Sequence, residues 1–123
     1  MVFRFTLEDS NFLSVNWWNL FTDHLSTAID RLHRPIKDIF LLDHLDCGAY
    51  KELYPSKAIR DEYKEASLNR MREIHERELT ELANRIHEYC ESKYCSCGNS
   101  DWENIRVSCF IVDLRGVVTQ LEN

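Results

Sequence analysis

Glycine and proline are scarce in this sequence of 123 residues, which has three glycines and two prolines. That scarcity excludes collagen-like and Gly/Pro-rich low-complexity chains. Long apolar runs are missing too: no stretch approaches the roughly 20 apolar residues of a membrane span, and the first residues lack the apolar core of a secretory signal. Because the hydrophobic fraction of 44% is ordinary, we expect a cytoplasmic protein whose residues 1–123 form a single domain.

Positive charge is also in short supply. Lysine and arginine number 15 against 21 aspartates and glutamates, which gives a net charge of −6 and a sequence pI of about 5.3. Proteins that bind DNA or RNA need a basic surface to replace the counterions of the phosphates. The composition therefore argues against direct nucleic-acid binding and favours association with basic protein surfaces.

The common sequence motifs of enzymes are absent. The glycines Gly48, Gly98 and Gly116 are isolated, so no Gly-rich loop can cradle a phosphate. Neither an H-E-x-x-H nor a G-x-S-x-G motif occurs. We therefore expect a protein that is not an enzyme and needs no cofactor, apart from a zinc ion considered below.

Two regions have the period-2 pattern of half-buried strands. Residues 2–7 place Phe3, Phe5 and Leu7 on one side, and residues 105–112 alternate in the same way. The segment 113–116 then predicts a hairpin turn with a return strand over 117–121. We expect the N-terminal strand and this hairpin to form a small antiparallel sheet.

Helical periodicity dominates the rest of the chain. Apolar residues recur at steps of three and four from Trp17 to Arg34, and Pro35 predicts the end of that helix. The run 36–45 fits either a buried helix or a strand, and we favour a helix. Together with a long charged helix over about 57–94, for which Ser56 is the expected N-cap, these segments predict an α+β fold with two or three helices packed against the sheet.

The segment 57–94 has nine acidic and eight basic side chains, which nearly cancel. An unbroken helix of that length would extend about 57 Å at ~1.5 Å per residue, whereas a chain of this size forms a globule roughly 35 Å across. Either the helix breaks near Ser67–Asn69, or its excess length contacts another surface, as in a homodimer. Its charged face and an aromatic edge are the predicted partner-binding surface, with the residues Trp18, Glu73, Arg77, Glu78, Glu81 and Arg85.

Three of the five cysteines lie close together near the end of this helix. With a histidine they form the spacing H-x2-C-x4-C-x-C, in which the candidate zinc ligands are His87, Cys90, Cys95 and Cys97. Four such ligands suffice for one structural zinc, provided that Cys95 and Cys97 lie in a loop beyond the helix. The alternative is a set of free thiols, with Cys90 as a small buried hydrophobe.

A second cluster, Asp43-His44-Leu45-Asp46-Cys47, contains the groups of a thiol nucleophile and its base. Neighbours in sequence rarely form a catalytic pair, because the partners must meet with aligned geometry. A loop with a buried cysteine is therefore the favoured interpretation. The histidines His24, His33 and His75 are expected to be packed or capped rather than ligands.

The composition and the charged helix lead to one functional hypothesis. We expect an acidic protein that binds another protein, as an inhibitor or accessory factor that blocks a nucleic-acid-processing enzyme. Bacterial immunity proteins and phage counter-defence proteins are similar in size and charge, although no motif supports a closer relationship. The alternatives are a zinc-stabilised structural or regulatory module and a thiol enzyme that uses Cys47.

Overall fold

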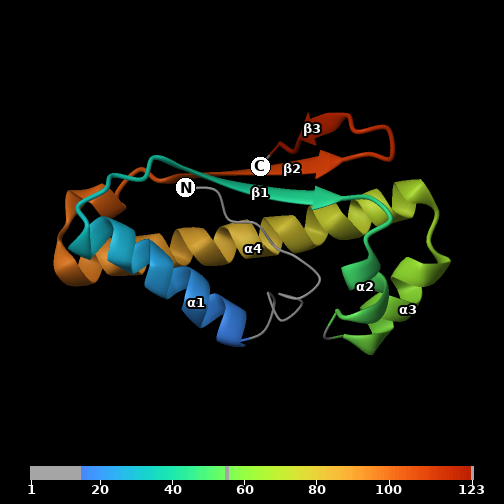
Figure 1. Cartoon of the computed structure of the whole chain (residues 1–123), viewed down its shortest axis with the longest axis horizontal. Coiled ribbons are helices and arrows are strands. Elements are labelled where there is room, and N and C mark those ends of the chain that lie inside the picture. Colours follow the sequence, from blue (N-terminus) through green and yellow to red (C-terminus); the bar gives the residue numbers. More distant parts are fainter. Residues whose placement is uncertain (1–14, 55, 123) are drawn as a thin grey trace.

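A computed structural model describes residues 15–54 and 56–122 (Figure 1). The elements in chain order are α1 (Val15–Ser26), the π-helical turn η2 (Thr27–Arg31), β1 (Asp38–His44), α2 (Gly48–Glu52), α3 (Lys57–Glu65), α4 (Leu68–Cys97), the 3-10 turn η3 (Ser100–Trp102), β2 (Arg106–Val112) and β3 (Val118–Gln120). The predicted α+β fold class is confirmed.

The described strands form one sheet in the order β1-β2-β3. β2 and β3 make the predicted antiparallel hairpin, whose turn uses Gly116 with a φ of 86°. The strand that joins this hairpin is β1, and it pairs with β2 in parallel, with Ile39 opposite Val107. The sheet is therefore mixed rather than wholly antiparallel, and the N-terminal strand predicted for residues 2–7 lies outside the described residues.

The prediction of a helix for residues 36–45 is wrong, because this run contains the strand β1. Its side chains alternate: Ile39 and Leu41 are buried, whereas Phe40 and Leu42 are 50% and 55% exposed. A short apolar run of this kind does not separate a strand from a buried helix by its periodicity. Pairing with β2, more than 60 residues later in the chain, decides the outcome.

Of the two alternatives left open for the segment 57–94, the structure has the break, so two helices replace the one long helix. α3 ends at Glu65, and α4 begins after Ser67, whose side chain accepts a hydrogen bond from the backbone N–H of Arg70 as an N-cap. Ser56 caps α3 in the same way, as predicted. α4 extends to Cys97, three residues further than expected, where Gly98 takes a left-handed conformation. Its 30 residues correspond to about 45 Å at ~1.5 Å per residue.

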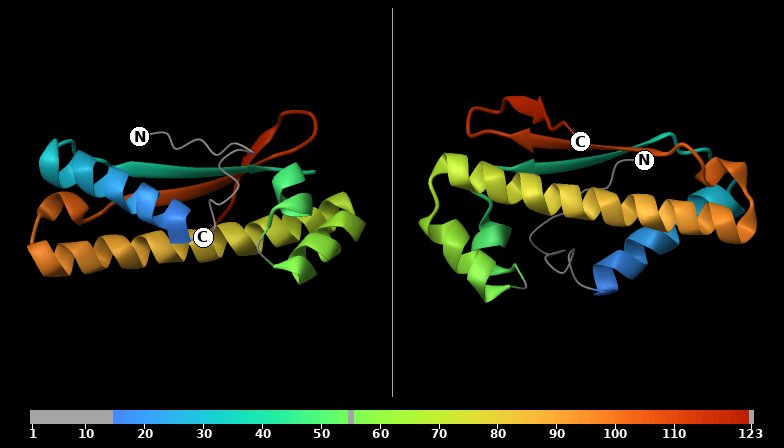
Figure 2. Two further views of the ribbon diagram at one scale, coloured as in Figure 1. Left: turned by 60° about the horizontal axis from the view of Figure 1, so that its bottom comes forward. Right: turned by 180° about the vertical axis from the view of Figure 1, so that it is seen from behind.

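The helices lie on one side of the sheet, and α4 runs beneath its strands (Figures 1 and 2). The core between these layers combines the inner face of α4, the inner residues of β1 and β2, and the apolar stripe of α1 and η2. Its largest fully buried side chains are Trp102, Tyr63, Phe21, Leu25, Ile29, Ile74, Ile86, Ile111, His75 and Cys109. The predicted N-terminal helix is confirmed as α1 and η2, which end before Pro35.

None of the described helices is both long enough and apolar enough to cross a membrane.

Candidate functional site

A buried polar network centred on His75 joins four parts of the fold. His75, on α4, has no exposed surface. Its Nδ1 lies 2.7 Å from Oδ2 of Asp43 at the end of β1, and its Nε2 lies 2.7 Å from the hydroxyl of Tyr63 on α3. Tyr50 on α2 donates a second hydrogen bond to the same Asp43 oxygen at 2.9 Å. The network therefore ties α2, α3 and α4 to β1.

The partners of Tyr63 and Asp43 assign the protons of this network. The backbone N–H of Cys47 donates to the Tyr63 oxygen at 2.9 Å, so the Tyr63 hydroxyl is free to donate its proton to Nε2 of His75. The Nδ1–H of His75 then donates to the Asp43 carboxylate. In this arrangement both ring nitrogens of His75 have a hydrogen-bond partner. His75 is thus a packed histidine, as the sequence predicted.

The tyrosines of the network are held in their neutral form. Burial, followed by the Asp43 carboxylate, raises the pKa of Tyr50 well above its ordinary value, and burial raises the pKa of Tyr63. The Tyr50 ring also packs on His75, with 4.2 Å between the ring centres. His75 and Tyr63 have no exposed surface, whereas 15% of the Asp43 side chain is exposed, so the network meets solvent mainly at this carboxylate.

Cys47, the candidate nucleophile, directly precedes the short helix α2 at its N-cap position. Burial raises the pKa of its thiol, and this effect outweighs the opposing backbone N–H groups of Tyr50 and Ala49. A reactive cysteine requires the opposite shift. Its neighbour His44 lies on β1 and directs Nδ1 to the carbonyl oxygen of Leu45 at 3.0 Å. The thiol-enzyme hypothesis needs a base in contact with the Cys47 thiol. The hydrogen bond of His44 Nδ1 goes to Leu45 instead.

The four candidate zinc ligands all lie on α4, whereas the zinc hypothesis placed Cys95 and Cys97 in a loop. That placement is wrong because the helix continues to Cys97. Residues two apart on a helix point about 200° apart, so Cys95 and Cys97 face opposite sides. Cys90 is buried, whereas His87 and both later cysteines are exposed. Among residues 15–54 and 56–122, no cluster of His, Cys, Asp or Glu is suited to hold a metal ion.

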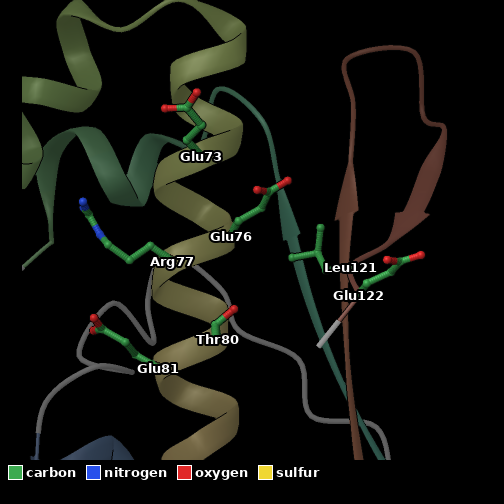
Figure 3. Close-up of a pocket in the computed structure, with 7 residues that line it drawn as sticks. All are labelled: Glu73, Glu76, Arg77, Thr80, Glu81, Leu121 and Glu122. Atoms are coloured by element: carbon green, nitrogen blue, oxygen red, sulfur yellow. The ribbon is translucent and has the colours of Figure 1, made fainter.

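A groove of about 680 Å³ runs between α4 and the segment that follows β3 (Figure 3). It is lined by four carboxylates and one guanidinium, together with Thr80 and Leu121; the charged residues are Glu73, Glu76, Glu81, Glu122 and Arg77. In Figure 3 Glu76 and Thr80 extend from α4 toward Leu121 and Glu122, whereas Glu73, Arg77 and Glu81 extend from the other side of the helix. We call this feature the acidic groove. It contains three of the predicted partner-binding residues: Glu73, Arg77 and Glu81.

A second cavity of about 520 Å³ shares Arg77 and Glu81 with the acidic groove, and it extends past Tyr54 to Arg85. Glu78 also lines it, but this residue is not the solvated side chain that the sequence predicted. Only 11% of its side chain is exposed, and it accepts a hydrogen bond from the hydroxyl of Tyr54. Burial, followed by the Glu78 carboxylate, raises the pKa of Tyr54. Glu78 therefore helps to fix Tyr54 against α4.

Trp18, which the sequence predicted as the aromatic edge, belongs to α1 and packs, half-buried, against α4. The Arg85 guanidinium lies over the Trp18 ring, with Cζ 4.1 Å from the ring centre, and Tyr89 meets the same ring edge-on at 6.0 Å. Two predicted partner-binding residues from distant parts of the sequence, Trp18 and Arg85, thus lie in direct contact. Such a cation–π contact presents a flat surface of mixed polarity beside the second cavity.

The sequence did not indicate several residues of these sites. The pairing of Asp43 with His75 spans 32 positions, and nothing in the local pattern of either residue predicts it. Glu76 and Thr80 of the acidic groove follow Glu73 at helical spacing, so the helix itself supplied a signal. No signal in the sequence pointed to Glu122, because only the path of the hairpin brings this residue to the groove beside α4.

The chain is an α+β protein with an acidic groove on α4, the longest of the described helices, and a largely buried polar network around His75. No family model matches the chain, and no solved structure matches it. It is similar to a protein of Rickettsia bellii (strain RML369-C) described as "Uncharacterized protein", with 29% identity over 106 residues. The alignment covers 86% of this chain and 52% of the relative, so the chain spans about half the length of the curated relative it matches.

Proposed function

We propose that this chain is a non-catalytic protein that binds a basic segment of another protein in the acidic groove. The observation that carries the proposal is the charge of the groove, a cavity of about 680 Å³ whose lining includes four carboxylates and one guanidinium. Opposite charge on a partner steers its approach and fixes its register. Leu121 adds an apolar contact at the groove wall, which suits a segment that alternates basic and apolar residues.

The surroundings of the groove support this role. The second cavity continues from it along α4 to Arg85, where the half-buried Trp18 offers an aromatic contact of the kind enriched in interface hot spots. A continuous surface of this kind fits an extended or helical segment better than a small molecule. Since α4 contributes most of its residues, the binding surface is built on a rigid element.

The acidic character suggests the class of target. Enzymes that process nucleic acids carry basic surfaces, and an acidic protein that occupies such a surface blocks it. We propose an inhibitor or accessory factor of this type, of the immunity or phage counter-defence kind. His75, the histidine with the best partners for acid–base work, is fully buried, which supports binding rather than catalysis. Five free cysteines favour a reducing compartment such as the cytoplasm.

The test compares three forms of the full chain as affinity baits. The groove variant carries Glu73→Lys, Glu76→Lys and Glu81→Lys. Glu78 is left unchanged, because its bond to Tyr54 would add a stability effect to the result. The control variant carries Asp23→Lys, Glu65→Lys and Glu88→Lys, which are exposed, lie outside the groove and change the net charge by the same amount.

We expect the wild-type chain and the control to co-purify the same basic protein from the native host, and the groove variant to lose it. With that protein purified, titration calorimetry should show binding that weakens as salt rises from about 0.05 to about 0.5 M, because salt screens exposed charges. All three forms should keep the same circular dichroism spectrum. Equal capture by all three baits would exclude the groove as the binding surface.

A further inference from the structure

A further cavity, of about 290 Å³, lies between the last turns of α4 and the segment that leads from η3 into β2. These two segments lie side by side at one end of the molecule, where the chain turns back from α4 toward the sheet (Figures 1 and 2). We call this feature the η3 cavity. Its volume is at the small end of the range of ligand pockets, roughly 300–1,000 Å³, so it suits a small ligand or a single side chain of a partner.

The walls of the η3 cavity are largely aromatic and apolar. Trp102 is 1% exposed and Tyr94 is 36% exposed, so the first ring belongs to the core and the second borders solvent. The indole of Trp102 is fixed by its hydrogen bond to Asp30 at 2.8 Å. Cys90 and Ile105 are buried beside it. Burial raises the pKa of Cys90 to about 11, so this thiol is uncharged at neutral pH.

Two carboxylates line the η3 cavity, and among the described residues no lysine or arginine does so. They belong to Glu91 and Glu103, which are both exposed. None of the salt bridges within residues 15–54 and 56–122 includes either of them. The acidic groove and the second cavity differ in this respect, because each contains an arginine. The two carboxylates are therefore available to a cation from outside.

The Trp102 ring already stabilises one cation of the chain itself. The Nζ atom of Lys93 lies 5.4 Å from the centre of this ring and 3.4 Å from Oδ2 of Asp30. An aromatic ring beside a carboxylate is thus the arrangement that this fold uses for an ammonium group. The η3 cavity combines the same two kinds of group, because aromatic rings line it together with Glu91 and Glu103.

We propose that the η3 cavity binds an organic cation, an ammonium or guanidinium group on an alkyl chain, with its charge at the carboxylates of Glu91 and Glu103 and its alkyl chain against Tyr94 and Trp102. The ring faces attract a cation, and the carboxylates repel an anion. A neutral apolar ligand would cover the carboxylates without a partner. Among the described residues, no cluster of His, Cys, Asp or Glu is suited to a metal ion.

The η3 cavity and the acidic groove are distinct sites on one side of α4. Glu91 follows Thr80 by 11 positions, which turns its direction by only about 20° and moves it about 16 Å along the helix axis. A long partner segment with a lysine or arginine can therefore span both sites, whereas a free alkylamine occupies the η3 cavity alone. Cation binding in the η3 cavity does not depend on a partner in the acidic groove.

Titration of the full chain, followed by nuclear magnetic resonance, tests this binding. The probes are N-acetyl-lysine amide and N-acetyl-arginine amide. The matched neutral probe is N-acetyl-norleucine amide, which has the lysine chain without its ammonium group. We expect both cationic probes to shift the indole N–H signal of Trp102 with a dissociation constant of about 1–10 mM. The neutral probe should bind at least about tenfold more weakly.

Matched variants show whether the carboxylates hold the charge. The test variant carries Glu91→Gln and Glu103→Gln, which keep the shape of the side chains and remove their charge. The control variant carries Glu65→Gln and Glu88→Gln, at exposed residues outside the η3 cavity. We expect the test variant to bind both cationic probes about fivefold more weakly and the control to bind them unchanged. Tyr94→Leu should weaken them about threefold, because it removes a ring face. Circular dichroism checks that each variant is folded.

Two further arms identify the source of the cation, and either result supports the site. If the test variant captures less of the basic partner than the control does, the cation is a side chain of that partner. If capture is unchanged and the test variant loses affinity for spermidine, the cation is a free polyamine. The groove variant should still bind N-acetyl-lysine amide, so failure of the η3 cavity and failure of the proposed function can be told apart.

Four results would overturn the proposal. One is a Trp102 signal that neither cationic probe shifts at concentrations up to about 50 mM. Another is equal binding of the norleucine probe, which would show that charge is not recognised. Equal loss of binding in the control variant would indicate general attraction to an acidic chain. Equimolar zinc chloride that shifts the Trp102 signal, while both cationic probes leave it unchanged, would assign the cavity to a metal.

Discussion

Asp43 accepts a hydrogen bond from His75 across 32 positions of the chain, with Nδ1 of the histidine 2.7 Å from Oδ2 of the carboxylate. The contact joins the end of β1 to the second turn of α4. It completes a buried network in which Tyr63 occupies the other ring nitrogen of His75. Each partner is placed by a different element, so the network forms only when the whole fold is assembled.

We expect His75→Ala to lower the free energy of unfolding by about 3–5 kcal/mol. The substitution leaves the Asp43 carboxylate and the Tyr63 hydroxyl without their partner, and it opens a cavity in the core. Urea denaturation followed by circular dichroism measures the loss. The control is His87→Ala on the exposed face of the same helix, for which the change should stay within about 0.5 kcal/mol. Equal losses for both variants would contradict the proposed network.

The pH dependence of stability should reveal Asp30. Burial raises the pKa of this carboxyl, but hydrogen bonds from Trp102, Asn99 and Lys93 outweigh burial, so its pKa is lowered in the folded state. A carboxyl of this kind stabilises the fold above its unfolded pKa of about 3.9. That contribution is lost as pH falls through the lower folded pKa.

The unfolding free energies of the wild type and Asp30→Asn should therefore differ by a constant amount between about pH 5 and 7, and the difference should shrink below about pH 4. The Trp102 indole, whose Nε1 donates to Asp30 at 2.8 Å, provides a fluorescence signal for the same titration. Asp23→Asn on the exposed surface of α1 is the control. A difference that persists unchanged to pH 2 would contradict this role for Asp30.

Native thiol labelling should separate the five cysteines into classes. Cys95 and Cys97 are exposed, so we expect iodoacetamide to modify them first. Burial raises the pKa of Cys90 and of Cys109 to about 11, and these two should react at least about ten times more slowly. Timed labelling at pH 8, with peptide mass spectrometry, gives the order. Selective modification of Cys47 would instead support the thiol-enzyme hypothesis.

Metal analysis tests the zinc hypothesis. A site made of His87, Cys90, Cys95 and Cys97 would require the last turns of α4 to unwind, because Cys95 and Cys97 point to opposite sides of the helix. We therefore expect less than about half an equivalent of zinc in the purified chain, with no effect of a chelator on Tm. One equivalent, released by the chelator with a fall in Tm, would support the zinc module.

Local signals in the sequence predicted much of the fold. Ser56 marks a helix start because its side chain caps the backbone three residues later. Gly116 marks the hairpin turn because the turn requires a positive φ. Each of these features depends on neighbours in the chain, which the sequence displays directly.

The sites were less visible because they depend on contacts between distant segments. The face of α4 that carries Glu73, Arg77 and Glu81 was predicted from its spacing, since one helix supplies it. Glu78 was assigned to the same solvated face, but Tyr54 lies over it. The second wall of the acidic groove, with Leu121 and Glu122, depends on the path of the hairpin.

The sequence by itself determined the helical periods, the caps, the hairpin and an acidic balance that favours basic partners. Only the tertiary structure decided that residues 38–44 form a strand, that His75 meets Asp43, and that Phe40 and Leu42 face outward. The physical reason is the same in each case. A short apolar run has no preferred structure until a partner strand supplies its hydrogen bonds, and a buried polar pair exists only where packing brings its members together.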